Sequence, residues 1–591
     1  MQSDFLDAQL RRHWLRWTLL AWGVFAGWFL WQRWGGIYWL ALSDTDDNMR
    51  LMQVRAWLNG QGWYDLRQYR LNPPGGFDIH WSRIVDLPIA GLILFFRLFT
   101  SPAWAERLAV GVAPLIPFSI AMSAMAVAAR RLINARAWPL ALVFLFGCSA
   151  TLLMYMPTRI DHHGWQLAAL AVTVAALADP RKARGGAIVG GASAFSLSIG
   201  LEMLPYAVGA GGILALRWVW DRAEAPRLGA YGASLAGGSA IGYLGFASYA
   251  NSAMRCDALT PVWLSATIAG GAFLLALAWL SPARREVRLV LALIAGGVLA
   301  GAFASLFPQC LARPEGVSDE LARTWLNNVR EARPIYKHPL RTAFPIAALP
   351  VIGLIGAIFA TWRARGDAAK LAGWVPVMLF TALACALLLW QVRVGPAAQL
   401  LAVPGVTALG WALFPRLLNH RLMAVRVIGS VGGFLIVSGL FAGLMIRWLP
   451  IDRPNAMQQR VSRANQRCAT IPAMRPLGRL PAQTVFTHVD LGPRLITLTH
   501  HRAIAGPYHR NGDAILDVHH AFQGSPATFY RIAKAHGATL LLICPNMAET
   551  TVYRSRSKNG VYAQIARGQI PAFLEPVMLP RNSPLRLFRI R

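Results

Sequence analysis

The sequence predicts an α-helical polytopic membrane protein that ends in a small α/β domain. Of its 591 residues, 55% are hydrophobic and only 14% are charged, and the chain contains 23 Trp and 26 Phe. This composition is typical of chains with many membrane spans and not of soluble enzymes. About thirteen apolar stretches reach the roughly 17 to 25 residues that a helix needs to cross a bilayer. They start near Trp14, Leu108, Trp138, Gly164, Gly186, Leu204, Leu228, Trp263, Leu289, Thr342, Trp374, Ala398 and Val425.

The basic residues predict how these spans are oriented. The net charge is +31, but the cations fall in short loops between apolar runs and not in arms or patches, which argues against nucleic-acid binding. Alternate connections carry three Arg or Lys each, while the short connections between them carry only Arg255 and Arg393. By the positive-inside rule the basic set is cytoplasmic, together with the amino terminus and its Arg11 and Arg12.

Three polar regions are then expected on the outward side of the membrane: loops at 43–86 and 308–341, and the segment after Leu449. We therefore expect a transmembrane domain over 1–449 and a soluble outward domain over 450–591. The apolar fragment from Leu87 to Thr100 is too short to span and is expected to be interfacial or re-entrant.

The carboxy-terminal domain has the sequence pattern of a small α/β fold. Strands are predicted near Thr484–Phe486 and Thr539–Ile543, with a helix near Pro526–Ala535. Of the six cysteines, four are expected outside, where disulfides are allowed, while Cys148 and Cys385 are expected within spans. Cys468 pairs with Cys544 in this prediction, and Cys256 with Cys310 is a second candidate pair.

The first chemical motif follows the first span and reads Ser43-Asp44-Thr45-Asp46-Asp47-Asn48-Met49-Arg50. Carboxylates crowded at an apolar boundary repel one another unless a cation or hydrogen-bond donor joins them, so this is a candidate catalytic or metal site. The alternative is a helix N-cap followed by a solvated acidic loop.

A second motif, Arg159-Ile160-Asp161-His162-His163, follows the third predicted span. Its carboxylate and imidazoles suit a divalent metal, or a base with its orienting partner. Interfacial side chains that reach toward water are the alternative.

Two further charged residues lie in the outward connections. Glu331 stands between arginines before the tenth span, where an ordinary surface ion pair is the simpler interpretation. Arg393 lies near the outward surface against the usual charge bias, and its planar fork suits phosphate oxygens. Together the motifs suggest an enzyme that acts on a phosphorylated lipid. They are equally compatible with a transporter that keeps its charges outside, although transporter sites usually lie near the midplane of the bilayer.

In their order along the chain, these segments resemble the catalytic subunit of oligosaccharyltransferase, which has the C-type glycosyltransferase (GT-C) fold with thirteen spans. Asp44, Asn48 and Arg50 match the spacing of that family's first motif, and Asp161 matches the first carboxylate of its second motif, where His163 replaces a Glu. The resemblance implies that Asp44, Asp46, Asp161 and Glu331 are catalytic. It also implies a donor-phosphate site, made of Arg393, Arg159, His162 and His163, and a Mg²⁺ or Mn²⁺ ion held by Asp44, Asp161, Glu331 and His163.

The carboxy-terminal motif departs from that family. Where oligosaccharyltransferases have Trp-Trp-Asp-Tyr-Gly, this chain has His488-Val489-Asp490-Leu491-Gly492. Because both tryptophans are missing, we expect an acceptor other than the Asn-x-Ser/Thr sequon. The expected acceptor-binding residues are Asp490, Tyr508, His509 and Arg510, and a role of the Tyr508-His509-Arg510-Asn511 run in domain packing is an equal alternative.

The resulting expectation is an inverting glycosyltransferase of a bacterial inner membrane, with its carboxy-terminal domain in the periplasm. Its partners would be the bilayer, a polyprenyl-phosphate or polyprenyl-pyrophosphate sugar donor, and a glycolipid or surface-glycan acceptor. The alternatives are a protein oligosaccharyltransferase with altered acceptor recognition and a lipid-linked glycan transporter.

Overall fold

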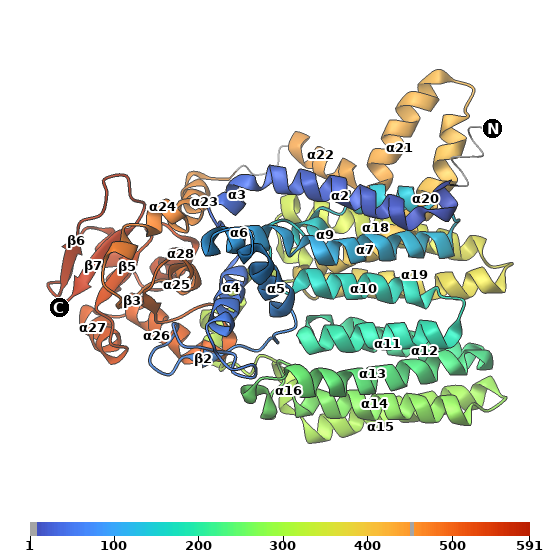
Figure 1. Ribbon diagram of the computed structural model, residues 1–591, viewed down its shortest axis with the longest axis horizontal. Coiled ribbons are helices and arrows are strands. Elements are labelled where there is room, and N and C mark those ends of the chain that lie inside the picture. The colour runs from blue at the N-terminus through green and yellow to red at the C-terminus, as the bar shows by residue number, and fades with distance from the viewer. Residues whose placement is uncertain (1–8, 450–453) are drawn as a thin grey trace.

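Long helices make up most of the computed structural model, which describes residues 9–449 and 454–591. The helices lie side by side in one layered bundle, and a smaller body built around a sheet caps one end of it (Figure 1). The polar helix α4 (Thr45–Leu58) and the largely apolar helix α5 (Asp86–Arg97) lie between these two parts. The predicted domain boundary at residue 450 lies outside the described residues.

Six helical segments of the described chain are long and apolar enough to cross a membrane. They are Pro102–Leu132 (α6, Pro102–Val112, with α7, Leu115–Leu132), α14 (Pro261–Leu280), α15 (Arg285–Leu306), α18 (Leu340–Arg363), α19 (Ala368–Leu388) and Val392–Leu418, which contains α20 (Gly395–Leu418). A bent pair, Val425–Val437 with α22 (Leu440–Trp448), makes up to seven. The predicted total of about thirteen spans is therefore matched only in part, and the remaining number stays a prediction.

The other bundle helices are shorter or less apolar. They are α2 (Trp14–Gln32), α3 (Trp34–Tyr38), α8 (Trp138–Leu145), α9 (Ser149–Leu153), α10 (His163–Leu177), α11 (Lys182–Ile199), α12 (Leu204–Trp220), α13 (Ala225–Phe246) and α21 (Ser430–Val437). The apolar run from Trp138, predicted as one span, is divided between α8 and α9. At this break, a Cβ on Gly147 would lie 3.0 Å from the Ser438 carbonyl oxygen, so the close approach of a neighbouring segment requires a residue without a side chain.

Small residues let pairs of bundle helices approach closely. A Cβ on Gly186 of α11 would lie 2.0 Å from the carbonyl oxygen of Arg227 on α13. Gly353 of α18 and Gly405 of α20 are in similarly close contact, because a Cβ on Gly405 would meet the Gly353 oxygen at 1.9 Å. Such contacts are typical of helix pairs that pack within a bilayer.

The carboxy-terminal body contains a five-stranded mixed sheet with strand order β4-β3-β5-β7-β6. Strand β3 (Thr484–Phe486) is parallel to β4 (Arg502–Ala503) and to β5 (Leu540–Ile543), whereas β7 (Arg586–Ile590) is antiparallel to β5 and β6 (Leu574–Val577). Its helices are α23 (Ala456–Cys468), α24 (Ile471–Met474), α25 (Gly492–Leu498), α26 (Gly512–Gln523), α27 (Pro526–Ala535), α28 (Ala548–Arg556) and α29 (Val561–Ala566). The two predicted strands and the predicted helix α27 lie at the expected residues.

The polar segments between the bundle and this sheet are packed into its core. One buried cluster joins Met49 of α4 and Trp81 to Leu495 of α25 and Leu542 of β5. The short antiparallel pair β1 (Arg67–Gln68) and β2 (Phe77–Asp78) belongs to the same region. Helices α16 (Gln309–Ala312) and α17 (Asp319–Thr324) come from the second predicted outward loop, and Leu321 of α17 lies in the core of the carboxy-terminal body. These shared cores fix the sheet against the loops that carry the candidate site.

Both predicted disulfides are present. Cys468 is bonded to Cys544, and Cys256 is bonded to Cys310. The second bond links the connection before α14 to the start of the 308–341 segment. The remaining cysteines, Cys148 and Cys385, are free.

Candidate functional site

Helix α4 begins inside the first acidic motif. Asp44 is its N-cap residue and accepts a hydrogen bond from the backbone N–H of Thr45 at 2.6 Å, while the Asn48 side chain donates to the Asp44 carbonyl oxygen at 2.6 Å. The helix then turns Asp47 fully inward and leaves Asp46 half-buried. The N-cap interpretation of Asp44 is therefore correct, and it is compatible with a chemical role, because a helix N-terminus stabilises negative charge.

Arg159 joins the two predicted motifs. Its guanidinium nitrogens lie 2.8 Å from Asp44 Oδ2, 3.5 Å from Asp47 Oδ2 and 2.7 Å from Asp161 Oδ2. The backbone N–H of Asp161 also donates to Asp47 Oδ1 at 2.9 Å. We refer to Asp44, Asp47, Asp161 and Arg159 as the carboxylate cluster. Within it, Arg159 is an ion-pair partner of acids, where the sequence predicted a phosphate ligand.

The carboxylates of this cluster and its neighbour Asp46 differ in proton affinity. Burial raises the pKa of Asp47 to about 8, with Asp161 and Asp44 adding to the effect and Arg159 opposing it. Burial, Asp44 and Asp161 raise the pKa of Asp46, and Glu331 contributes in the same direction. Burial would also raise the pKa of Asp161, but Arg159, His163 and His162 hold it below its ordinary value. The Arg159 guanidinium therefore pairs with several carboxylates of this cluster at once, and ionising all of them together costs free energy.

The two histidines of the second motif lie at the start of α10. His162 is buried, and its Nε2 lies 3.0 Å from Glu202 Oε1, while Gln166 donates to the other oxygen of Glu202 at 2.9 Å. Ligand atoms of Asp161, His162 and His163 all lie within 4.8 Å of one another. The buried Nδ1 of His162 has no hydrogen-bond partner in the described part of the chain. These residues fit a divalent cation by donor type and by spacing.

The predicted acceptor residues lie against the same motifs. Tyr508 is buried and donates its hydroxyl to the Thr45 carbonyl oxygen at 2.9 Å, so it is anchored at the start of α4. Arg510 pairs with both oxygens of Asp257 at 2.7 Å, and His509 Nε2 lies 2.6 Å from Asp257 Oδ2. His509 and Arg510 are thus tied to the connection before α14.

Asp490 lies at the carboxyl end of β3, in η10 (Val489–Leu491). Its backbone N–H donates to Glu549 Oε2 at 3.0 Å. Burial, with a contribution from Asp44, raises the pKa of the Asp490 carboxyl to about 6. The charge of Asp44 therefore acts on the carboxy-terminal body as well as on the carboxylate cluster.

Glu331 and Arg393, which we call the open pair, are arranged differently. Both side chains are exposed, Glu331 in η5 (Arg330–Ala332) and Arg393 in η7 (Val392–Val394). The backbone N–H of Val392 donates to the Arg333 carbonyl oxygen at 2.8 Å, which ties the two short helices together. Neither side chain has an ion-pair partner among residues 9–449 and 454–591. The surface ion pair considered for Glu331 is absent from this part of the chain.

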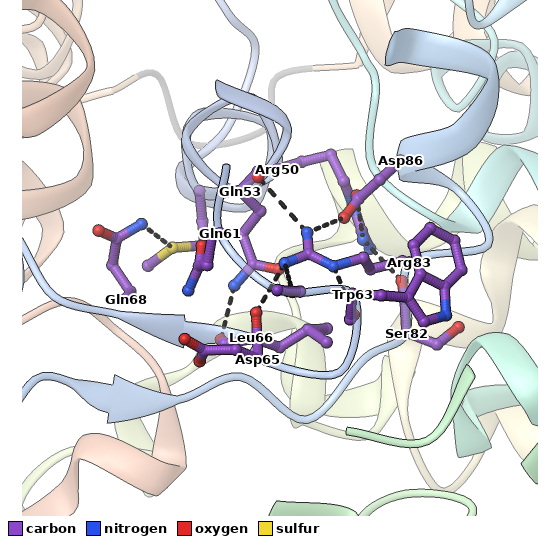
Figure 2. A network of polar contacts seen from close by, with 12 residues as sticks. Arg50, Gln53, Gln61, Trp63, Asp65, Leu66, Gln68, Ser82, Arg83 and Asp86 are labelled. Carbon is purple, nitrogen blue, oxygen red and sulfur yellow. Dashed lines mark hydrogen bonds and ion pairs between the residues drawn. The ribbon is translucent and has the colours of Figure 1, made fainter. Parts of the chain in front are cut away.

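Arg50 belongs to a separate buried network that braces the loop after α4. It donates to Asp86 Oδ1 at 2.9 Å, and Asp86 also pairs with Arg83 at 3.4 Å. Arg83 in turn donates to the carbonyl oxygens of Trp63, Gly62 and Asp65 (Figure 2). Arg50 also donates to the Ser82 carbonyl oxygen at 3.1 Å, so these two bonds tie α4 to the segment at the start of α5.

Several residues at the site were not selected from the sequence. Asp47 stood in the first motif, and its spacing of three from Asp44 on a helix could have indicated a shared face. Glu202, Asp257 and His80 gave no such signal, because each lies far along the chain from its partner. His80 lies against His509, with ring centroids 4.6 Å apart, and the ring of the adjacent Trp81 lies 5.4 Å from that of His162.

Comparisons with known proteins show which solved structures have a similar fold. No protein-family model and no curated protein matches the sequence. Among solved structures, the chain is similar to the Archaeoglobus fulgidus oligosaccharyltransferase tethered to an acceptor peptide containing the NVT sequon, with a TM-score of 0.68 at 13% identity over 95% of this chain and 72% of that one. It is also similar to that organism's AglB in complex with an inhibitory peptide and a dolichol-phosphate, with a TM-score of 0.66 at 12% identity, covering 96% and 73%.

A third match is the Archaeoglobus fulgidus enzyme in complex with Zn and sulfate, with a TM-score of 0.55 at 12% identity over 90% of this chain and 68% of that one. The predicted resemblance is therefore confirmed at the level of structure. At these identities the similarity extends to the fold, and the chain has the GT-C fold of the oligosaccharyltransferase catalytic subunit.

Proposed function

We propose that this protein is an inverting glycosyltransferase that uses a polyprenyl-phosphate or polyprenyl-pyrophosphate sugar donor. The observation that carries the proposal is the carboxylate cluster, which Arg159 holds together at the polar end of a GT-C bundle. Next to this cluster lie the imidazoles of His162 and His163, and the exposed Arg393 offers a further cation. Acids beside unsatisfied donors and a free guanidinium suit transfer from a phosphate leaving group.

In the proposed reaction, a hydroxyl oxygen of the acceptor attacks the anomeric carbon of the donor sugar. The bond from that carbon to the phosphate oxygen breaks, and the electron pair leaves with the phosphate. Asp44 or Asp46 orients the acceptor hydroxyl and takes its proton. Arg393, with His162 and His163, binds the departing phosphate, whose growing charge they stabilise more strongly than that of the bound donor.

A divalent cation, Mg²⁺ or Mn²⁺, fits the donor set at Asp161 and His163, with Asp44 and Glu331 as further oxygen ligands. The short distance between ligand atoms of Asp161 and His163, within 4.8 Å, and the crowded acids support this assignment. When bound, such an ion supplies positive charge next to the leaving phosphate. The similar Archaeoglobus enzyme in complex with Zn is consistent with an ion at this fold.

For the acceptor we propose a glycolipid or a surface glycan. Tyr508 is bonded to Thr45 at the start of α4, and Asp44 acts on the carboxyl of Asp490. His509 and Arg510 follow Tyr508 and are held by Asp257. A protein acceptor is the second candidate, favoured by the similarity to an oligosaccharyltransferase solved with an acceptor peptide. The missing tryptophans of the sequon-reading motif argue for the first.

We further propose that the site faces the periplasm of a bacterial inner membrane. Disulfides in both outward segments support an oxidising compartment. A reporter that is active only outside the cytoplasm should be active when fused after Leu449 and silent when fused at Gly185. The reverse pattern would contradict this placement, because the proposed site would then face the cytoplasm.

Mass spectrometry of lipids and surface glycans from cells with and without the gene tests the function. A glycolipid or glycan that loses one sugar in the deletion strain supports the proposal. Loss of sugar only from protein would establish the second candidate. If the deletion strain has the same glycosidic bonds but a different distribution of a lipid-linked glycan across the membrane, the protein is a transporter.

A further inference from the structure

A cavity of 470 Å³ opens in the carboxy-terminal body, apart from the carboxylate cluster and the open pair. It lies beyond Ile543, the last residue of β5, and is walled by the end of α28, by α29 and by the start of β7. At this edge of the sheet, β5 pairs with the antiparallel β7, and Arg586 lies opposite Ile543. The volume of the cavity is that of an ordinary small-molecule site.

Four cationic side chains line this cavity: Arg554, Lys558, Arg567 and Arg586. Arg554 lies in the last turn of α28, and Lys558 follows that helix. Arg567 follows α29, and Arg586 is the first residue of β7, opposite Ile543. All four are exposed. We call this site the basic cavity.

Acids do not neutralise the basic cavity. The chain from Pro545 to Arg591 contains eight Arg or Lys residues and two acids, Glu549 and Glu575. Glu549 is directed to the backbone N–H groups of Val489 and Asp490, and Glu575 pairs with Arg591 at 3.3 Å. None of the four cavity cations has a carboxylate partner within residues 9–449 and 454–591. Four like charges around one cavity repel unless an anion joins them.

The rest of the lining narrows the class of ligand. Asn546 offers an amide that can bind hydroxyl groups, and Pro545 and Ala566 offer small apolar surfaces. The ring of Tyr562 is buried, so its face does not provide a platform on which a nucleobase could stack. The volume also exceeds that of a bare phosphate or sulfate. A sugar that carries a negative group meets all of these conditions.

We propose that the basic cavity binds an anionic saccharide, whose phosphate or carboxylate is held by Arg554, Lys558, Arg567 and Arg586. This is a binding site and does not depend on the proposed transfer reaction. If the anionic sugar is part of a larger glycan, the site would hold that glycan on the carboxy-terminal body.

Calorimetric titration of the purified full-length protein in detergent tests the proposal, with glucose 6-phosphate and glucuronate as probes. We expect at least one of them to bind and its affinity to fall as salt is added, because exposed charges are screened. The variant Arg554→Gln/Arg586→Gln should weaken binding by at least about tenfold. The control variant Arg531→Gln/Arg581→Gln removes two exposed arginines of the same body outside the cavity and should bind as the wild type does.

Other ligands and variants supply the opposing outcomes. The proposal is overturned if neutral glucose binds equally well, if inorganic phosphate binds as tightly as glucose 6-phosphate, or if ADP binds more tightly. Binding only to phosphatidylglycerol vesicles would identify a lipid surface in place of a saccharide. If Arg393→Ala loses binding while the cavity variant still binds as the wild type does, the probe binds at the candidate catalytic site. Should the double variant not fold, Lys558→Gln gives the same comparison with a single exposed charge removed.

Discussion

The carboxylate cluster and the open pair differ in how far the protein itself satisfies their charges. Arg159 is within 3.5 Å of three carboxylates in the cluster, and Asp47 and Asp161 are buried there. Glu331 and Arg393 are exposed on short 3₁₀ helices. Buried charges must be paired in the folded protein, whereas exposed charges are solvated until a ligand arrives. The comparison indicates that the cluster is held in place by the protein itself, and we propose that the open pair completes the site on ligand binding.

The largest loss of activity should follow from a substitution in the carboxylate cluster. Asp161→Asn keeps the shape of the side chain but removes a charge that faces Arg159 and His163, so turnover should fall by about 10² to 10³. Donor binding should change less, because the interaction acts mainly in the transition state. The control Asp513→Asn changes an exposed acid of α26 and should leave turnover unchanged. Equal donor affinity and equal turnover for Asp161→Asn and the wild type would remove the cluster from the mechanism.

The next largest effect is on donor binding and should follow from a substitution in the open pair. Arg393→Ala removes an exposed guanidinium, so the protein should fold normally while donor binding weakens by about 10- to 100-fold, the value of a charge-assisted contact. Arg255→Ala is the matched control, since Arg255 is the other basic residue predicted in the short outward connections. Donor titration of both variants makes the comparison. A loss of the same size in Arg255→Ala would show that general surface charge, and not Arg393, attracts the donor.

A smaller effect tests whether the two halves act together. Glu331→Gln should slow turnover by about tenfold, which corresponds to about 1.4 kcal/mol of barrier. If Glu331 and Asp161 serve one cation, the double variant should be little worse than Asp161→Asn alone, and added Mn²⁺ should bind more weakly to either. Fully multiplicative losses in the kinetic cycle would mean that the halves work independently.

The smallest effect is on stability and lies outside both halves. Burial raises the pKa of Glu549 to about 8, with Asp490 adding to it. The folded state therefore holds a proton that the unfolded state loses near pH 4, so the free energy of unfolding should fall as pH rises from about 4 to 8. In Glu549→Gln this slope should be shallower, although the variant loses about 1 kcal/mol because the backbone N–H groups of Val489 and Asp490 share one acceptor oxygen. Thermal unfolding across this pH range measures the slope. Identical slopes for Glu549→Gln and the wild type would contradict the raised pKa of Glu549.

Local patterns predicted much of the fold. Strand β3 and helix α27 lie at the residues that alternation and helix signals indicated, because short-range sequence decides both. The division of one predicted span into α8 and α9 was not predicted, and the segment at Ser438 that approaches Gly147 at this break lies far along the chain. The sequence indicated which residues belong to the candidate site, but it did not indicate which of them contact one another. Arg159 meets Asp44 across 115 positions of the chain, and His509 meets Asp257 across 252, and no local signal encodes such pairings.

The most direct test of the account is transfer by the purified protein in lipid vesicles, supplied with a polyprenyl-pyrophosphate-linked labelled sugar and with extracts of cell-envelope glycolipid. The account predicts a labelled product with a new glycosidic bond of inverted configuration and release of one polyprenyl pyrophosphate per sugar transferred. Asp161→Asn should form both products about 10² to 10³ times more slowly. Undiminished product formation by Asp161→Asn, or movement of the labelled lipid across the bilayer with no new bond, would contradict it.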